Sequence, residues 1–472
     1  MQLPDVGVGV VYDSVLRPLA AASSSLIDVL EIEPQTRWRP LCGNRIDTAD
    51  GTLVEELRDL PQAHLVHSVG APVGGSHFAE IRQMELLAQT VSVLESPWAS
   101  EHLAFDRVGG DRPFHAGFFL PPCQNLAGVR VAVRNIQELR KRLSVPLAVE
   151  TGVNYLRPRP DEIADGDFVA MIAEEADCGL LLDLHNVWTN ARNGRQPVDE
   201  FLAAIPRERV WEVHLAGGRE LDGYWLDAHS DVVPTELMSI ARAVVPALPE
   251  LHAIVFEILP QYVIGVTLNR IERQLAAMHE LWELRRPTVS VVPVRPTAPL
   301  TLNSVTPELW ELTLASLVIG DTCEGALASG FGCDPGSALL RTLAAEARAS
   351  AIVSTLPFTL RMLMMSVGPS VTRDLIGAFR ATHTPELFAA NEALAFIDFL
   401  RCRALDAEHL DAVVAFEAAV IRATIDRRRT TVHFSCNPEA LFAALAAREA
   451  LPPAVPGQAF VVHVGIESVP ST

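Results

Sequence analysis

Short apolar runs rich in β-branched residues recur from residue 6 to residue 258, and they constrain the fold more than any other feature of this sequence. The runs are residues 6–11, 29–33, 64–69, 98–105, 146–150, 179–184, 210–216 and 252–258. Amphipathic stretches with helical spacing lie between them, at residues 78–94, 128–143, 161–176 and 235–245. An open doubly wound sheet usually needs fewer strands, whereas a TIM barrel needs eight that alternate with helices. The sequence therefore predicts an α/β fold, a (β/α)8 TIM barrel.

The composition changes after residue 286. Residues 287–299 carry four prolines in thirteen positions, and proline fixes φ and removes a backbone donor. We therefore expect an extended linker between a barrel at residues 1–286 and a second domain at residues 300–472. Helical spacing rich in Ala and Leu in that second part, followed by alternation at residues 430–434 and 460–464, predicts a smaller, mainly helical α+β domain.

Charge and cysteine content exclude several classes of function. The chain has 38 Lys and Arg against 58 Asp and Glu, a formal net charge of −20, which disfavours binding to nucleic-acid phosphates. Seven scattered cysteines without a C-x-x-C pair disfavour a disulfide framework, an iron–sulfur cluster and a structural zinc site. The first residues show no signal-peptide pattern, and no apolar run approaches about 18 residues. We expect a cytoplasmic protein with neither a nucleic-acid nor a membrane partner.

Ionisable and amide side chains fall at the carboxyl ends of six consecutive predicted strands, where the loops of a barrel enzyme carry its chemistry. They are His67, His102, Glu150, Asp183, His185, Asn186, His214 and Glu257. The loop after the seventh strand adds Asp227 and His229, two residues apart. A single strand-end histidine is more often a hydrogen-bonded structural residue than a metal ligand. Several carboxylates that converge on one rim repel each other, however, so the whole set predicts compensation by metal ions.

The ligand types narrow the choice of metal. Imidazoles mixed with carboxylates, without a thiolate, suit iron, manganese or zinc. The candidates are too many for one ion, so we expect two or three ions bridged by carboxylates such as Glu150.

Eight segments of the chain, in order, resemble the multinuclear non-haem iron enzymes that modify cysteines in ribosomally made peptides, as in methanobactin and 3-thiaglutamate biosynthesis. The segments are LEIE at Leu30, HSVGAPVG from His67, SEHLAF from Ser100, LPP at Leu120, AVETGVNYL from Ala148, GLLLDLHNVWTNARN from Gly179, EVHLAGG from Glu212 and LDAHSDVV from Leu226. The chain departs from the common pattern of this family at Thr151, His185, Gly218 and residues 258–259, where the family has Asn, Asn, His and Arg-Asp.

The resemblance implies an activity and a ligand set. It implies an oxidoreductase in which two or three iron ions (Fe2+/Fe3+), with O2 as co-substrate, oxidise a cysteine of a precursor peptide. Independently of the resemblance, we expect Glu257 or a bridging carboxylate such as Glu150 to act as a base. The implied iron ligands are His67, His102, Glu150, Asp183, Asn186, His214, Asp227, His229 and Glu257. Family members usually work with a separate partner protein that recruits the peptide. Residues 300–472 loosely resemble such partners, which implies a fusion of enzyme and partner.

Two other functions fit the same residues. One is a non-redox, manganese- or zinc-dependent sugar isomerase or hydrolase on a TIM barrel. The other is a peptide-binding module whose catalytic site has decayed, and the departures from the family pattern at Thr151 and Gly218 favour it. The helical C-terminal region can also be a stabilising or dimerising appendage, because helical cores are far commoner than binding modules.

Overall fold

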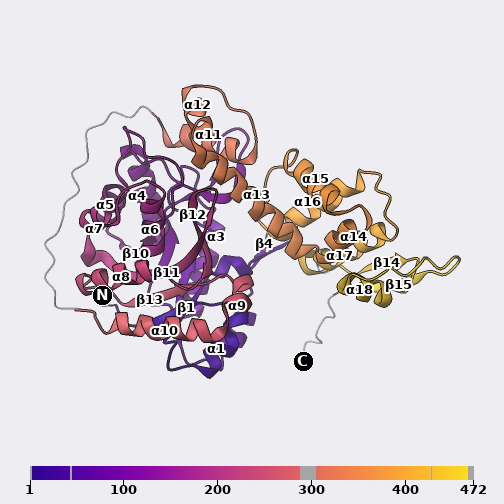
Figure 1. The fold of residues 1–472 in the computed structure, drawn as a ribbon, viewed down its shortest axis with the longest axis horizontal. Coiled ribbons are helices and arrows are strands. Elements are labelled where there is room, and N and C mark those ends of the chain that lie inside the picture. The colour runs from indigo at the N-terminus through magenta and orange to yellow at the C-terminus, as the bar shows by residue number, and fades with distance from the viewer. Residues whose placement is uncertain (1–2, 43–44, 287–304, 427, 466–472) are drawn as a thin grey trace.

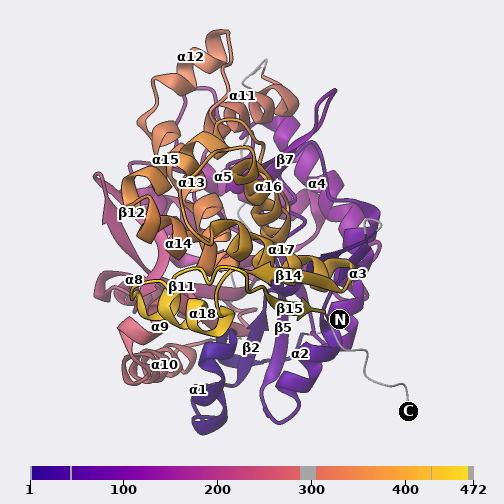
Figure 2. The same cartoon turned by 90° about the vertical axis from the view of Figure 1, so that its right-hand side faces the viewer.

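The computed structural model describes residues 3–42, 45–286, 305–426 and 428–465. A closed barrel forms one body, and C-terminal helices extend from its upper edge into a second body on one side (Figure 1). The view turned by 90° looks through this second body onto the barrel behind it (Figure 2). The predicted linker, residues 287–299, lies outside the described residues, so the division into residues 1–286 and 300–472 stays a prediction.

Eight parallel strands form the barrel, and each of the eight apolar runs supplies one of them. The strands are β1 (Gly7–Val11), β2 (Val29–Ile32), β5 (Ala63–Ser68), β6 (Ala99–His102), β9 (Leu147–Glu150), β10 (Gly179–Asp183), β11 (Val210–Leu221) and β13 (Ala253–Glu257). Each pairs with its neighbours in the order β10-β9-β6-β5-β2-β1-β13-β11, and a pairing of β10 with β11 closes the ring. The predicted fold class is therefore confirmed.

Helices surround the barrel and cover the outward faces of its strands. The α-helices are α1 (Arg17–Ala22), α2 (Asp50–Leu57), α3 (Ile81–Val93), α4 (Leu126–Arg140), α5 (Asp165–Ala176), α6 (Leu184–Arg192), α7 (Val198–Ala204), α8 (Thr235–Val244), α9 (Pro260–Val266) and α10 (Leu268–Trp282). Short 3-10 helices are η1 (Ser14–Leu16), η2 (Pro34–Arg37), η3 (Arg207–Arg209) and η4 (Val245–Ala247). Side chains such as Ile136 of α4, Ile172 of α5 and Leu275 of α10 are fully buried in one core with the strands. Burial of these apolar faces is the main stabilising term of the barrel.

Three antiparallel pairs add to the barrel at its rim. The pairs are β3 (Arg39–Leu41) with β4 (Arg45–Asp47), β7 (Phe105–Val108) with β8 (Phe114–Leu120), and β11 with β12 (Tyr224–Asp231). The run at residues 98–105, which the sequence presents as one strand, is thus divided between β6 and β7. Asp222 and Gly223 both have positive φ, 51° and 82°, as a tight two-residue hairpin requires. This turn lets β11 continue past the barrel and return as β12.

The C-terminal part is mainly helical, as predicted, with one small sheet. Its elements are α11 (Pro307–Ile319), α12 (Ala326–Gly332), α13 (Pro335–Thr355), α14 (Pro357–Ser366), α15 (Pro369–Arg380), α16 (Ala389–Arg401), α17 (Leu410–Asp426), β14 (Thr430–Phe434), α18 (Pro438–Ala447) and β15 (Phe460–Val464). The strands β14 and β15 pair antiparallel, although α18 separates them in the sequence. Among the described residues no single helix is long and apolar enough to cross a membrane, and α13 with α14 meets that criterion only as a pair bent by 100°.

Helix α13 links the two bodies through two different cores. Leu340 near its start shares a core with Trp310, Phe331 and barrel loop residues such as Tyr155. Ile352 near its end belongs to a separate core formed by the later helices and the small sheet. Helix α11 also contacts the barrel through Glu311, whose carboxylate accepts hydrogen bonds from the backbone N–H and the hydroxyl of Ser76. The first helices of the C-terminal part are therefore docked on the barrel.

Candidate metal centre

The ionisable side chains at the strand ends converge at the carboxyl end of the barrel. Parallel register explains the convergence, because His102 of β6 lies beside Glu150 of β9, and Asp183 of β10 lies beside His214 of β11. Five groups of three ligand atoms lie within 4.8 Å of one another: His67/His102/Glu150, Glu150/Asp183/His214, Asp183/His229/Glu257, His185/Asp227/His229 and Glu31/Glu212/His214. The groups share members, so they form one continuous cluster.

Glu150 lies between two histidines at one end of this cluster. Nε2 of His67 and Nε2 of His102 lie 3.2 and 2.9 Å from the same oxygen, Oε2 of Glu150. The other ring nitrogens are taken, since Nδ1 of His67 contacts the Ser100 hydroxyl at 2.8 Å and Nδ1 of His102 contacts the Ser68 carbonyl at 3.2 Å. Burial would raise the pKa of Glu150, but the charge of His102 and then of His67 holds it well below its usual range. Both histidines therefore direct Nε2 at the centre.

Asp183 and Glu257 lie in the middle of the cluster. Oδ1 of Asp183 caps α6 by accepting a hydrogen bond from the Asn186 N–H at 2.9 Å. Burial, together with the negative charges of Asp227, Glu257 and Glu150, holds the pKa of Asp183 well above its usual range. Oε1 of Glu257 lies 3.1 Å from Nδ1 of His214, and its Oε2 lies 3.2 Å from Nε2 of His229.

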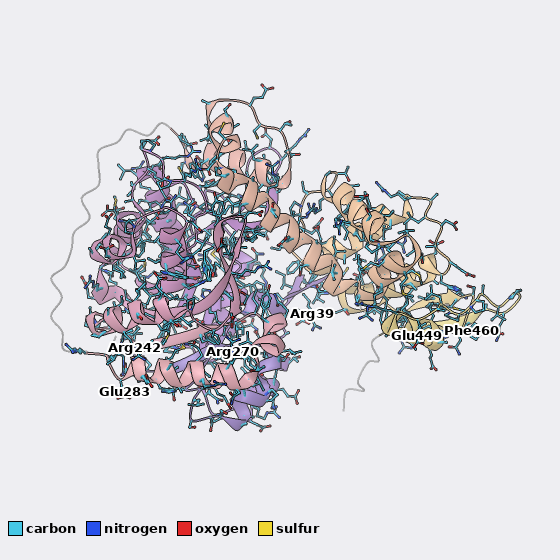
Figure 3. The ribbon with its side chains drawn as sticks, in the orientation of Figure 1. Arg39, Arg242, Arg270, Glu283, Glu449 and Phe460 are labelled. Atoms are coloured by element: carbon cyan, nitrogen blue, oxygen red, sulfur yellow. The ribbon has the colours of Figure 1, made fainter. Side chains whose placement is uncertain are left out.

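The hairpin of β11 and β12 supplies the outer end of the cluster. Oδ1 of Asp227 contacts both Nε2 of His229, at 2.8 Å, and Nδ1 of His185, at 2.9 Å. His229 has a φ of 43°, an uncommon left-handed conformation for a residue with a side chain. The ion pair of Arg270 with Asp231, 2.8 Å, holds the end of β12, and Figure 3 shows Arg270 at the lower part of the barrel body. The left-handed backbone of His229 is a local strain of the kind that clusters at functional sites.

Two buried carboxylates that sequence reasoning missed border the cluster. Oε2 of Glu31 lies 2.9 Å from Nε2 of His214, and Oε1 of Glu212 lies 3.6 Å from the same nitrogen. Oε2 of Glu212 accepts a hydrogen bond from the Trp98 indole at 2.9 Å. Both glutamates are fully buried inside apolar strands rather than at their ends. An acidic residue within an apolar strand is the signal that would have found them.

Metal ions would satisfy the donor atoms of the cluster better than hydrogen bonds among these atoms do. Among the described residues, several buried nitrogen and oxygen atoms of this cluster make no hydrogen bond although they lie close together. They are Oε2 of Glu150, Oδ2 of Asp183, Oδ1 of Asn186, both ring nitrogens of His214, Nε2 of His229 and Oε2 of Glu257. Buried polar atoms are normally hydrogen-bonded, and a site for a metal ion is one recognised reason for exceptions. Imidazole, carboxylate and amide donors suit iron, manganese or zinc.

Two cavities flank the cluster. One, of about 430 Å3, is bordered by His229 and Glu257 of the cluster and by Glu33, Arg37 and Arg39. Figure 3 shows Arg39 on the side of the barrel that faces the C-terminal body. The other, of about 440 Å3, lies between β8 and helices α13 and α16. Phe119, in its wall, lies with its ring centroid 4.6 Å from that of His102. Cluster residues line the first cavity, whereas the second is separated from His102 by Phe119.

Comparison with known proteins identifies the family. Residues 20–258 match the family described as RiPP precursor modification enzyme MbnB/TglH/ChrH, where RiPP denotes a ribosomally synthesised and post-translationally modified peptide. The chain belongs to this family. Every strand end of the cluster, from His67 to Glu257, falls within the matched residues. The C-terminal helices fall outside them.

Two relatives and one solved structure are also similar to this chain. A UPF0276 protein of Anaeromyxobacter sp. is 31% identical over 215 residues, 45% of this chain and 74% of the relative. A UPF0276 protein of Streptomyces avermitilis is 32% identical over 222 residues, 46% of this chain and 45% of the relative. The crystal structure of D-psicose 3-epimerase from Clostridium cellulolyticum H10 covers 59% of this chain and 98% of the epimerase, with 11% identity and a TM-score of 0.39. A likeness this distant says nothing about activity.

Proposed function

We propose that this chain is an iron-dependent oxidase that uses O2 to modify a cysteine of a ribosomally made precursor peptide. Membership of a precursor-modification family supports a peptide substrate. The observation that carries the proposal is the buried cluster of histidines and carboxylates, in which several donor atoms lack hydrogen bonds. Bound iron would supply redox chemistry with oxygen and a site for the substrate sulfur.

The proposed ligands form three overlapping sets around two or three ions. His67, His102 and Glu150 make the first set, and Glu150, Asp183 and His214 make the second. Asp183, His229 and Glu257 make the third set. Two further ligands are proposed: Asp227, which is grouped with His229, and Asn186, whose Oδ1 is buried without a hydrogen bond. Glu150 belongs to two sets, which supports a bridging role. His185, predicted from the sequence as a further ligand, contacts Asp227 through Nδ1 at 2.9 Å.

Glu257 is the proposed base. Its Oε2 is buried without a hydrogen bond, and the residue borders the cavity of about 430 Å3. In this proposal the substrate thiol enters this cavity, and Glu257 in its wall receives the proton. The charges of His229 and His214 lower the pKa of Glu257 in spite of its burial, so the carboxylate is ionised and ready to accept.

The C-terminal part is the proposed site of peptide recruitment. In this proposal residues 1–286 form the catalytic barrel, residues 287–299 the linker, and residues 300–472 replace the separate partner protein. The cavity between β8 and the helices α13 and α16 supports it, because both bodies border this space next to His102. Arg348 and Glu392, a buried ion pair at 2.7 Å, form part of its wall.

Metal analysis followed by an oxygen-controlled assay tests the proposal. Protein purified without chelator should contain iron, and it should convert a cysteine-containing peptide encoded by a neighbouring gene in air but not under anaerobic conditions. Glu150→Gln should lose iron and turnover. The control Asp165→Asn alters a buried carboxylate paired with Arg195, away from the cluster, and should keep iron. Stoichiometric zinc without iron, or turnover that is independent of oxygen, would favour a non-redox enzyme. Iron binding without turnover would favour a decayed peptide-binding module.

A further inference from the structure

His185 has both ring nitrogens in use, and this fixes where its proton lies. The Trp225 indole N–H donates to Nε2 of His185 at 3.1 Å. An indole nitrogen can only donate, so Nε2 must be the acceptor nitrogen of a neutral imidazole. The ring proton is then on Nδ1, which lies 2.9 Å from Oδ1 of Asp227 and donates to it. His185 is fully buried, so water does not compete for either contact.

Trp225 is held firmly in the position from which it donates. Its backbone N–H donates to Oδ1 of Asn193 at 2.9 Å, and its carbonyl accepts from Nδ2 of the same asparagine at 2.9 Å. Trp188 packs edge-on against the indole with ring centroids 5.2 Å apart. The guanidinium of Arg192 lies over both rings, 4.8 and 5.0 Å from their centroids. Asn193 therefore fixes the backbone of Trp225, while Trp188 and Arg192 pack on its ring.

Gly218 leaves the space in which the indole and the imidazole meet. A Cβ at this position would lie 2.6 Å from Nε1 of Trp225 and 3.0 Å from Nε2 of His185. It would also lie 2.1 Å from the backbone carbonyl oxygen of Leu226, which cannot move aside as a flexible side chain can. A glycine is therefore needed for the contact between Trp225 and His185.

We propose that His185 is a positioning residue that binds no metal and instead fixes the carboxylate of Asp227. This inference rests on the proposed metal centre and differs from the sequence-based prediction, which counted His185 among the ligands. Nε2 is blocked by the indole N–H, and Nδ1 carries a proton. Both His185 and His229 contact the same oxygen of Asp227, Oδ1, so Oδ2 keeps its lone pairs for an ion. A hydrogen bond of this kind fixes the orientation of a ligating carboxylate.

The Trp225→Phe variant distinguishes a positioning residue from a ligand by the sign of its effect. If His185 positions Asp227, loss of the indole N–H frees the imidazole to rotate or to change tautomer, and the affinity for metal falls. If His185 is a ligand through Nε2, loss of the competing N–H exposes that nitrogen, and the affinity rises. Trp188→Phe is the matched control, because Trp188 packs on the same indole without a hydrogen bond to His185.

Two substitutions of His185 distinguish the role of Nδ1 from the role of Nε2. Asparagine keeps an N–H near the position of Nδ1 and can still donate to Asp227, whereas glutamine places its amide near Nε2 and loses that donor. We expect His185→Gln to weaken metal binding by about tenfold to a hundredfold, as loss of such a hydrogen-bonding partner typically does, and His185→Asn to restore most of the loss.

The measurement is a titration of metal-free protein with Co2+ against a competing chelator, read by the visible absorption of the bound ion. The proposal expects weaker binding in Trp225→Phe and His185→Gln, near wild-type binding in Trp188→Phe and His185→Asn, and the same number of ions in all four at saturation. Equal loss of one ion in both His185 variants, or tighter binding in Trp225→Phe, would overturn it. Absence of binding in the wild-type protein would instead overturn the proposed metal centre.

Discussion

Replacing Asp183 by asparagine should stabilise the metal-free protein and destabilise the metal-loaded protein. Asp183 is fully buried, and burial with the charges of Asp227 and Glu257 raises its pKa well above the usual range. The folded protein therefore holds this proton more tightly than the unfolded chain does. As the pH rises past the ordinary pKa of an aspartate, the unfolded chain releases this proton while the folded protein keeps it, so the free energy of unfolding falls. Asparagine mimics the protonated acid and removes this cost.

The size of the effect follows from the two carboxylate oxygens. Oδ1 caps α6, and asparagine is as good an N-cap as aspartate, so this contact is kept. Oδ2 is buried without a hydrogen-bond partner, which costs about 1–3 kcal/mol. An amide N–H2 in its place can donate to Glu150 or Glu257, each of which has a ligand atom within 4.8 Å of one on Asp183. The metal-free variant should gain about 1–3 kcal/mol in the free energy of unfolding.

With metal bound, the wild-type protein should be more stable than Asp183→Asn, because asparagine removes an anionic ligand. Metal at about a hundred times its Kd stabilises the wild-type protein by about 2.7 kcal/mol, and the variant should lose most of this gain. Urea unfolding at neutral pH, once with chelator and once with ferrous iron, measures the free energy of unfolding without and with metal. Asp165→Asn is the control: it breaks a buried pair with Arg195 and should destabilise the protein in both conditions. A metal-free Asp183→Asn protein that unfolds at lower urea than the wild type would refute the argument.

Three further predictions concern the rest of the chain. Trp310→Ala should lower the free energy of unfolding by about 3–5 kcal/mol, because Trp310 is 5% exposed in the core between α11 and the barrel. Leu309, the control, is 49% exposed, so Leu309→Ala should change the free energy of unfolding by less than about 0.5 kcal/mol in the same denaturant titration. Gly218→Ala should lower the melting temperature, since its Cβ meets a backbone oxygen at 2.1 Å; Gly51→Ala, with nothing within 4 Å, should not, and an equal fall in both would contradict the steric reason. Burial raises the pKa of Glu311 to about 7, so the wild-type protein should lose stability between about pH 4.5 and about pH 7 and Glu311→Gln should lose less; equal pH profiles would contradict this.

The barrel could be predicted because its strands are short, apolar and separated by helical stretches of regular length. The candidate cluster followed from the same reading, since parallel strands place their carboxyl ends at one rim. Glu31 and Glu212 could not be found in that way, because they lie within strands and only the closed ring turns both toward His214. The hairpin of β11 and β12 was also missed. Its Asp222-Gly223 turn is a known hairpin signal that lies just beyond the predicted end of the strand.

The departures from the family pattern acquire a physical meaning only in three dimensions. His185 and Gly218 lie 33 positions apart in the sequence, and each taken alone reads as the loss of a family residue. In the structure they are neighbours, because a Cβ on residue 218 would lie 3.0 Å from Nε2 of His185. A side chain restored at position 218 would therefore displace the imidazole or the indole of Trp225. The two positions are thus sterically coupled, because an imidazole from α6 occupies space that a bare backbone on β11 leaves open. A decayed site would not need such a match, so this pairing favours a centre that is still held in order.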